Sequence, residues 1–230
     1  LIILIQTLIK MDNLNILFVG DSGTGKSSLI SAIIKEYYGD DYNENNLLYI
    51  NNLKDQGISY YRSDVKTFCQ TTSCTNKKKK IIILDDVDII NEQSQQVFRT
   101  CIDKYSHNVH FLSSCTNTQK VIDSLQSRMS IIKIKSLNND NLEKILKKIC
   151  KSEKMVIDRA SQEFIISISN NSIRILINYL EKIKLLNTDV DKKLVSQICT
   201  NICFLEFEKY TKLCKFDKNR QKAIYLLYDI

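Results

Sequence analysis

Short, continuous apolar runs alternate with helical patterns over the first 135 residues. Within each run the apolar residues follow one another without polar positions between them, unlike the alternating pattern of a strand that faces water on one side. The runs that we expect to be strands are 15–19, 47–50, 81–84, 109–112 and 131–134. Between them, apolar residues recur at helical spacing, as at Leu29, Ile33 and Ile34. The pattern predicts an α/β fold, with a parallel sheet covered by helices on both faces.

The pattern changes after about Lys135, where the strand signals cease. Apolar residues then follow the i, i+3, i+4, i+7 spacing of one helix face, first at Leu142, Ile145, Leu146 and Ile149. We expect an α/β domain over residues 1–135, a small all-helical domain over 136–187 and the start of a further helical domain over 188–230. The sequence begins without Met and stops inside a helical pattern, which indicates a fragment of a longer chain.

Composition narrows the class of protein. Hydrophobic residues at 43% and charged residues at 26% are typical of a globular protein and exclude a disordered or collagen-like chain. The 33 Lys and Arg residues against 26 Asp and Glu give a formal net charge of +7, which favours a polyanionic partner such as nucleic acid. The 8 cysteines contain no C-x-x-C pair, which favours buried thiols over a zinc site. The opening apolar run is too short to cross a bilayer, and so we expect an intracellular protein without a membrane partner.

One glycine-rich segment carries a specific chemical signal. The segment from Gly20 to Ser27, GDSGTGKS, follows the first predicted strand directly and precedes a predicted helix. It fits G-x-x-x-x-G-K-[ST], in which backbone N–H groups and the helix N-terminus cradle phosphates. We expect Lys26 to reach the terminal phosphates of ATP and the Ser27 hydroxyl to ligate Mg²⁺. The residues expected around the nucleotide are Gly20, Asp21, Ser22, Gly23, Thr24, Gly25, Lys26, Ser27 and Ser28.

Two acidic residues follow the predicted strand 81–84. The carboxyl ends of parallel strands are where ligands bind in open α/β sheets. We therefore expect Asp85 to complete the Mg²⁺ site through water, and Asp86 to polarise the water that attacks the γ-phosphate. The predicted strand 47–50 lies between this strand and the phosphate loop in sequence, an arrangement similar to that of the additional-strand ATPases.

Three longer stretches resemble the small subunits of replication-factor-C-type sliding-clamp loaders, which are AAA+ ATPases. The stretches are LYINNLKDQGISYYR at 48–62, DDVDIINEQSQQVFR at 85–99 and SSCTNTQKVIDSLQSR at 113–128. They are similar, in this order, to the family's strand with an Asp-x-Gly-Ile turn, its Walker B strand with a Gln-Gln helix, and its sensor 1 strand with a Ser-Arg-Cys motif. The resemblance covers nearly the whole chain. It implies an AAA+ P-loop domain, then a helical lid, then the start of a helical collar.

The resemblance also implies roles for five further residues. Thr116 falls at the sensor 1 position, Arg128 at the arginine finger that completes a neighbour's ATP site, and Arg174 at sensor 2. Arg62 and Lys66 fall on a helix that faces DNA in the family, and so they are candidates for phosphate contacts.

At the level of function, the resemblance implies an ATP- and Mg²⁺-dependent ATPase. It would work in a hetero-pentamer of clamp-loader subunits, which opens a sliding clamp and closes it around primer-template DNA. The implied location is the nucleus or a viral replication site.

The acidic motif departs from the family pattern. The family has Asp-Glu-Ala-Asp where this chain has Asp-Asp-Val-Asp at 85–88, so the Asp86 carboxylate is one methylene shorter than the usual glutamate. We therefore expect slow hydrolysis. One alternative is a structural clamp-loader subunit that binds ATP without hydrolysing it and donates its arginine finger. Another is a different AAA+ machine, such as a branch-migration helicase or a replication initiator.

Overall fold

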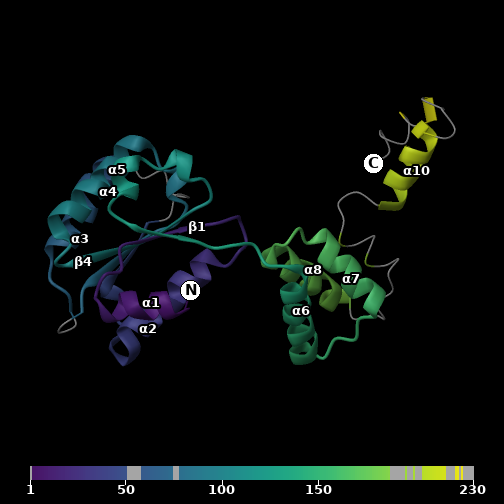
Figure 1. The fold of residues 1–230 in the computed structure, drawn as a ribbon, viewed down its shortest axis with the longest axis horizontal. Coiled ribbons are helices and arrows are strands. Elements are labelled where there is room, and N and C mark those ends of the chain that lie inside the picture. Colours follow the sequence, from purple (N-terminus) through teal and green to yellow (C-terminus); the bar gives the residue numbers. More distant parts are fainter. Residues whose placement is uncertain are drawn as a thin grey trace. The chain divides into compact units, whose positions relative to one another are not determined.

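The structure is a computed structural model that describes residues 2–50, 58–74, 78–186, 195, 199, 204–215, 221–222 and 224. The chain divides into two compact units, Leu1–Lys135 and Ser136–Ile230 (Figure 1). No helix in the described part is long and apolar enough to cross a membrane.

The first unit is built on a parallel five-stranded sheet with the order β2-β3-β4-β1-β5. The strands are β1 (Ile16–Val19), β2 (Leu47–Ile50), β3 (Lys80–Leu84), β4 (Val109–Cys115) and β5 (Ser130–Lys133). All five runs predicted as strands are confirmed, and β4 continues three residues beyond its predicted end. Because β4 pairs with both β1 and β3, the ends of these two strands flank the end of β4.

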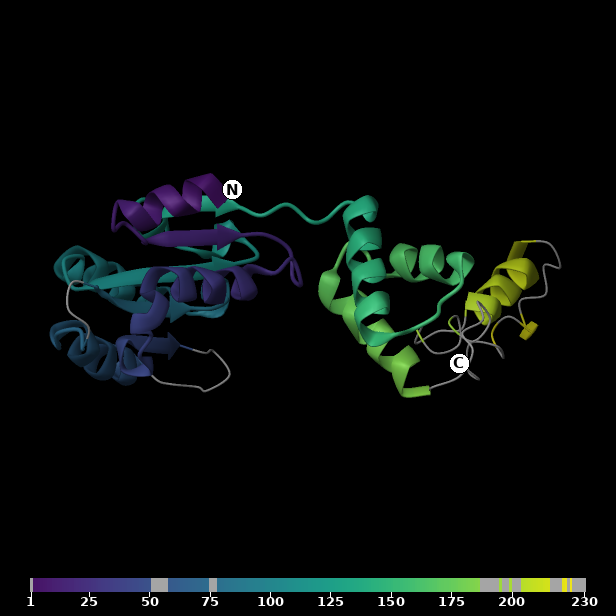
Figure 2. The same ribbon diagram turned by 90° about the horizontal axis from the view of Figure 1, so that it is seen from below.

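Helices cover both faces of this sheet (Figure 1). The helices of the unit are α1 (Ile2–Lys10), α2 (Lys26–Tyr38), α3 (Ile58–Gln70), α4 (Glu92–Tyr105) and α5 (Asp123–Gln126), with short 3-10 turns η1 (Gly39–Asp41), η2 (Glu44–Asn46), η3 (Val87–Ile89) and η4 (Thr118–Lys120). Figure 2 looks onto the face that α1 and α2 cover, and α3, α4 and α5 cover the other face.

The continuous apolar runs follow from this two-sided cover. On β1, Ile16 and Phe18 enter the core beneath α1 and α2, whereas Leu17 between them enters the core beneath α3 and α4. Residues of β3 alternate in the same way between the two cores. Complete burial of a large apolar side chain contributes roughly 1.5–3 kcal/mol, so neither face of these strands tolerates polar residues well.

The second unit is helical. Its described helices are α6 (Asn139–Glu153), α7 (Arg159–Ile168), α8 (Ile173–Leu186) and α10 (Phe204–Lys215). Leu142 and Leu146 of α6 pack with Ile165 of α7 and with Leu176 and Leu180 of α8 in one apolar core. The expected boundary between a lid and a further helical domain, near residue 188, lies outside the described residues.

Candidate functional site

The glycine-rich loop at 20–25 connects β1 to α2 at the carboxyl edge of the sheet. Gly23 has φ 77 and Gly25 has φ 90, which lie in the left-handed region that glycine adopts without steric cost. A Cβ atom on Gly20 would lie 2.5 Å from the carbonyl oxygen of Ile134, closer than real contacts of this kind. The loop therefore has the turns and the bare backbone that a phosphate cradle requires.

Lys26 begins α2 and is buried, with a relative exposure of 6%. Its ammonium donates to the carbonyl oxygens of Gly20, at 2.8 Å, and Asp21, at 2.9 Å. Both of these partners belong to the loop and both are neutral, so the hydrogen bonds do not balance the charge of the buried cation. A buried cation is stable only with good compensation, and a phosphate group fits this requirement.

The Ser27 hydroxyl and the Asp85 carboxylate meet at the end of β3. Ser27 Oγ donates to Asp85 Oδ2 at 3.0 Å and lies 3.3 Å from Asp85 Oδ1. Oxygen donors of this kind suit Mg²⁺. No group of three His, Cys, Asp or Glu side chains within the described ranges could hold a metal ion. A bound Mg²⁺ would therefore take its other ligands from phosphate oxygens and water, as Mg²⁺ commonly does.

Ser114 of β4 holds both acidic residues at the end of β3. Its hydroxyl donates to Asp85 Oδ1 at 2.5 Å and accepts the backbone N–H of Asp86 at 3.1 Å. Ser114 is fully buried. Ser114 is not among the residues predicted from the sequence, although two serines in a row at the end of an apolar strand, Ser113 and Ser114, are a visible signal.

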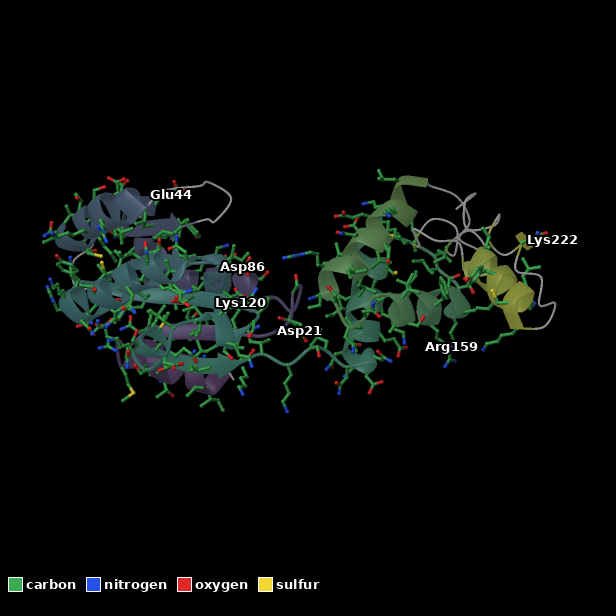
Figure 3. The ribbon with its side chains drawn as sticks, turned by 90° about the horizontal axis from the view of Figure 1, so that it is seen from above. Asp21, Glu44, Asp86, Lys120, Arg159 and Lys222 are labelled. Atoms are coloured by element: carbon green, nitrogen blue, oxygen red, sulfur yellow. The ribbon has the colours of Figure 1, made fainter. Side chains whose placement is uncertain are left out.

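Asp86 adopts a left-handed backbone, with φ 52 and ψ 56. This conformation costs a non-glycine residue roughly 1 kcal/mol or more, and the hydrogen bond of its N–H to Ser114 helps to hold it. Asp86 and Asp21 of the glycine-rich loop both lie at the carboxyl edge of the sheet (Figure 3). The location agrees with the expected one, and the role of Asp86 as a base stays a prediction.

Thr116 has a partner that the sequence analysis did not name. Its hydroxyl donates to Asp88 Oδ2 at 2.5 Å, and the N–H groups of Thr116 and Asn117 donate to the same oxygen at 3.2 and 3.0 Å. Burial raises the pKa of Asp88, but these hydrogen bonds outweigh it and hold the pKa below its usual value. Asp88, the third acidic residue of the Asp-Asp-Val-Asp motif, thus holds the backbone at the end of β4 in place. The sensor 1 role of Thr116 stays a prediction.

Arg128 is bound within its own unit. Its Nε donates to Asp103 Oδ1 at 2.5 Å, and its Nη1 donates to the carbonyl oxygen of Ser124 at 2.7 Å. Arg99 Nε lies 3.5 Å from the other oxygen of Asp103. The hydrogen bond from Arg128 holds the pKa of Asp103 below its usual value. To contact the ATP of a neighbouring subunit, Arg128 would have to leave the Asp103 carboxylate and bind a phosphate oxygen instead.

The remaining predicted residues lie on helices of the two units. Arg62 and Lys66 are exposed, one turn apart on α3, and they line a cavity of about 420 Å³ together with Lys104 of α4. Ser28 is exposed on the first turn of α2. Arg174 lies on α8, in the second unit. The DNA-contact and sensor 2 roles therefore stay predictions.

Comparisons with known proteins identify the family of the chain. Residues 16–137 match the family model for the ATPase family associated with various cellular activities (AAA). The chain is 31% identical to a protein named as a replication factor C small subunit of Acanthamoeba polyphaga mimivirus, over 95% of this chain and 68% of that protein. It is 29% identical to the replication factor C small subunit of Methanococcus maripaludis, over 94% of this chain and 69% of that protein.

Solved structures share the fold at lower identity. A RuvB mutant of Thermotoga maritima matches with a TM-score of 0.63 and 13% identity, over 93% of this chain and 73% of that one. Domain III of the Thermotoga maritima replication initiation protein DnaA matches with a TM-score of 0.64 and 19% identity, over 85% of this chain and 88% of that one. The fold, the phosphate loop and the extended sequence similarity lead to one conclusion. The chain belongs to the replication factor C small-subunit family of AAA+ ATPases and has a clamp-loader role.

Proposed function

We propose that this protein is an ATP-hydrolysing subunit of a clamp loader that places a ring-shaped sliding clamp on primer-template DNA. The observation that carries the proposal is the meeting of Lys26, Ser27 and Asp85 at one edge of the sheet, where the buried Lys26 ammonium makes no ion pair with any residue that the structure describes. The family membership supports a complex with other clamp-loader subunits, which we propose to be a hetero-pentamer.

Each residue of the site has a defined task in this proposal. The loop N–H groups and Lys26 bind phosphate oxygens, and Lys26 exchanges its two carbonyl partners for them. Ser27 and Asp85 hold Mg²⁺, which supplies positive charge at the phosphates when bound. Asp86 orients the attacking water, at a low rate because its side chain is short. Thr116 and Arg174 contribute at the γ-phosphate, and Arg128 acts on the ATP of a neighbouring subunit.

A non-hydrolysing structural subunit is the second candidate function. Two observations favour it: Asp86 replaces the longer glutamate of the family pattern, and the Thr116 hydroxyl is bound to Asp88. The likeness to RuvB and DnaA concerns the fold alone, and the family membership favours clamp loading over branch migration and initiation.

Ser114→Ala is expected to weaken Mg²⁺-dependent ATP binding about tenfold or more, because loss of a residue that orients a metal ligand typically costs 10- to 100-fold in affinity. Titration of a fluorescent ATP analogue with and without Mg²⁺ measures this. The matched control is Ser113→Ala: Ser113 is also fully buried in β4, but its Oγ has no hydrogen-bond partner in the described part of the chain. Equal losses in both variants, or a loss that persists without Mg²⁺, would contradict the positioning role of Ser114.

DNA binding by the assembled complex is expected to depend strongly on salt and little on base sequence, because Arg62 and Lys66 would contact phosphates. Each lost phosphate contact lowers the slope of log K against log salt by about 0.9. The double variant Arg62→Ala with Lys66→Ala should therefore lower the slope by roughly 1.8. Fluorescence anisotropy with labelled primer-template DNA at several salt concentrations measures the slope.

The control removes a charge from the opposite face of the sheet. Lys10 is exposed on α1, which covers the face away from α3. We expect Lys10→Ala to leave the slope unchanged. If the slope is unchanged by the two α3 substitutions, or if it changes as much with Lys10→Ala, α3 is excluded as a DNA contact.

A further inference from the structure

Two cysteines lie on neighbouring helices, and one of them lines a cavity between these helices. Cys69 is on α3 and Cys101 is on α4, and both side chains belong to the apolar core between these helices and the sheet. Their relative exposures are 0% and 4%. Cys101 nevertheless forms part of the wall of the cavity of about 420 Å³ between the two helices. A small molecule in this cavity would therefore contact Cys101, although this residue is almost entirely buried.

The two thiols interact directly. Each is the side-chain hydrogen-bond partner of the other, and both are free thiols. The hydrogen bond to Cys101, together with burial, raises the pKa of Cys69. The same hydrogen bond, with the nearby charges of Lys104 and Lys66, lowers the pKa of Cys101 in spite of its burial. Of the two thiols, Cys101 is therefore the one whose surroundings favour loss of its proton.

The walls of the cavity suit an anionic sulfur. Arg62, Lys66 and Lys104 line it, and so do the polar side chains of Gln93, Gln96 and Thr100. Positive charge beside a cysteine favours the thiolate, which is the reactive form. Access, charge and a second thiol within hydrogen-bonding contact thus occur together at this one place.

We propose that Cys69 and Cys101 form a redox-responsive thiol pair, in which a hydroperoxide that enters the cavity oxidises Cys101 and Cys69 then closes a disulfide between α3 and α4. This inference goes beyond ATP hydrolysis and clamp loading, and it does not depend on either.

The chemistry balances in two steps. In the first step the Cys101 sulfur attacks the outer oxygen of the hydroperoxide, the O–O bond breaks, and the alkoxide or hydroxide leaves and takes up the Cys101 proton. Cys101 becomes a sulfenic acid. In the second step the Cys69 sulfur attacks the Cys101 sulfur, the S–O bond breaks, and water leaves with the Cys69 proton. The two thiols lose two electrons, and the hydroperoxide gains them.

The test is peptide mapping of the full chain after treatment with a limited amount of hydrogen peroxide. The protein is reduced, freed of reductant, exposed to peroxide, and blocked with N-ethylmaleimide before digestion and mass spectrometry. We expect a disulfide-linked peptide pair containing Cys69 and Cys101 to form at peroxide doses at least tenfold below those that oxidise Cys74 and Cys214. These two thiols are exposed and serve as controls on the same chain. Earlier oxidation of the exposed thiols would overturn the proposal.

Two variants separate the steps. Cys69→Ser removes the second sulfur, and so we expect a sulfenic acid at Cys101 that dimedone traps. Cys101→Ser should leave Cys69 reduced at the same dose. In the unaltered chain, unfolding in urea should abolish the preference for Cys69 and Cys101 over Cys74. A preference that survives in urea would overturn the proposal, since the cavity would then play no part.

Discussion

Lys26→Ala is expected to lower the affinity for Mg·ATP at least 100-fold, so that binding is lost at practical nucleotide concentrations. The Lys26 ammonium is buried and makes two hydrogen bonds to loop carbonyls, which phosphate oxygens would replace. A hydrogen bond to a charged group contributes about 1.5–3 kcal/mol, and 1.4 kcal/mol corresponds to tenfold in affinity. Two such bonds therefore correspond to roughly 10²- to 10⁴-fold. Equilibrium titration with a fluorescent ATP analogue measures the loss.

Lys35→Ala is the matched control for this result, because Lys35 is an exposed lysine on the same helix. We expect it to bind the analogue as the unaltered protein does. The melting temperature of each variant without nucleotide shows whether it is folded. A folded Lys26→Ala variant with unchanged affinity would remove the basis for the phosphate loop as the ATP site.

Arg128→Ala is expected to lower ATP hydrolysis by about 10³-fold or more at the neighbouring subunit's site that we propose it completes, because arginine fingers contribute this much to phosphoryl transfer. The effect should appear in assembled complexes and not in the isolated subunit, where Arg128 is bound to Asp103. Asp86→Glu tests the subunit's own site. It should raise the rate by up to roughly 10²-fold, because a correctly placed base contributes 10²- to 10⁴-fold.

Complexes assembled from altered and unaltered subunits separate the two roles. If Asp86→Glu raises turnover, the subunit hydrolyses its own ATP slowly. If only Arg128→Ala has an effect, the subunit acts by donating its arginine. Arg99→Ala is the control, since Arg99 lies beside the same Asp103 carboxylate, and we expect it to leave turnover unchanged. If neither Asp86→Glu nor Arg128→Ala changes turnover, the proposed roles of Asp86 as a base and of Arg128 as an arginine finger are both excluded.

The strands and the phosphate loop could be predicted because their signals are local. A strand that is covered on both faces has to be apolar along its length, as at Ile81, Ile82 and Ile83. The phosphate loop needs glycine at positions 23 and 25, because the backbone there has a positive φ. Such requirements are visible within a few residues of sequence.

The partners of polar side chains could not be predicted in this way. The order of the strands depends on pairings between segments far apart in the chain, and this order decides that Ser114 lies beside Asp85. The contact of Thr116 with Asp88 and that of Arg128 with Asp103 have the same origin, since the partners are 28 and 25 positions apart in the sequence. The family resemblance assigned roles to Thr116 and Arg128 without showing which carboxylates hold them.

Stability and catalysis favour different residues at position 86, where the backbone of Asp86 is left-handed. Glycine adopts that conformation without steric cost and would relieve the strain, which favours a more stable fold. Glycine has no side chain, however, and so it could not act on water as we propose for the Asp86 carboxylate. A selection for heat resistance and a selection for catalysis would therefore enrich different residues at position 86. If Asp86 has the proposed role, the residue found at this position in related chains would indicate whether each of them still uses its own ATP site.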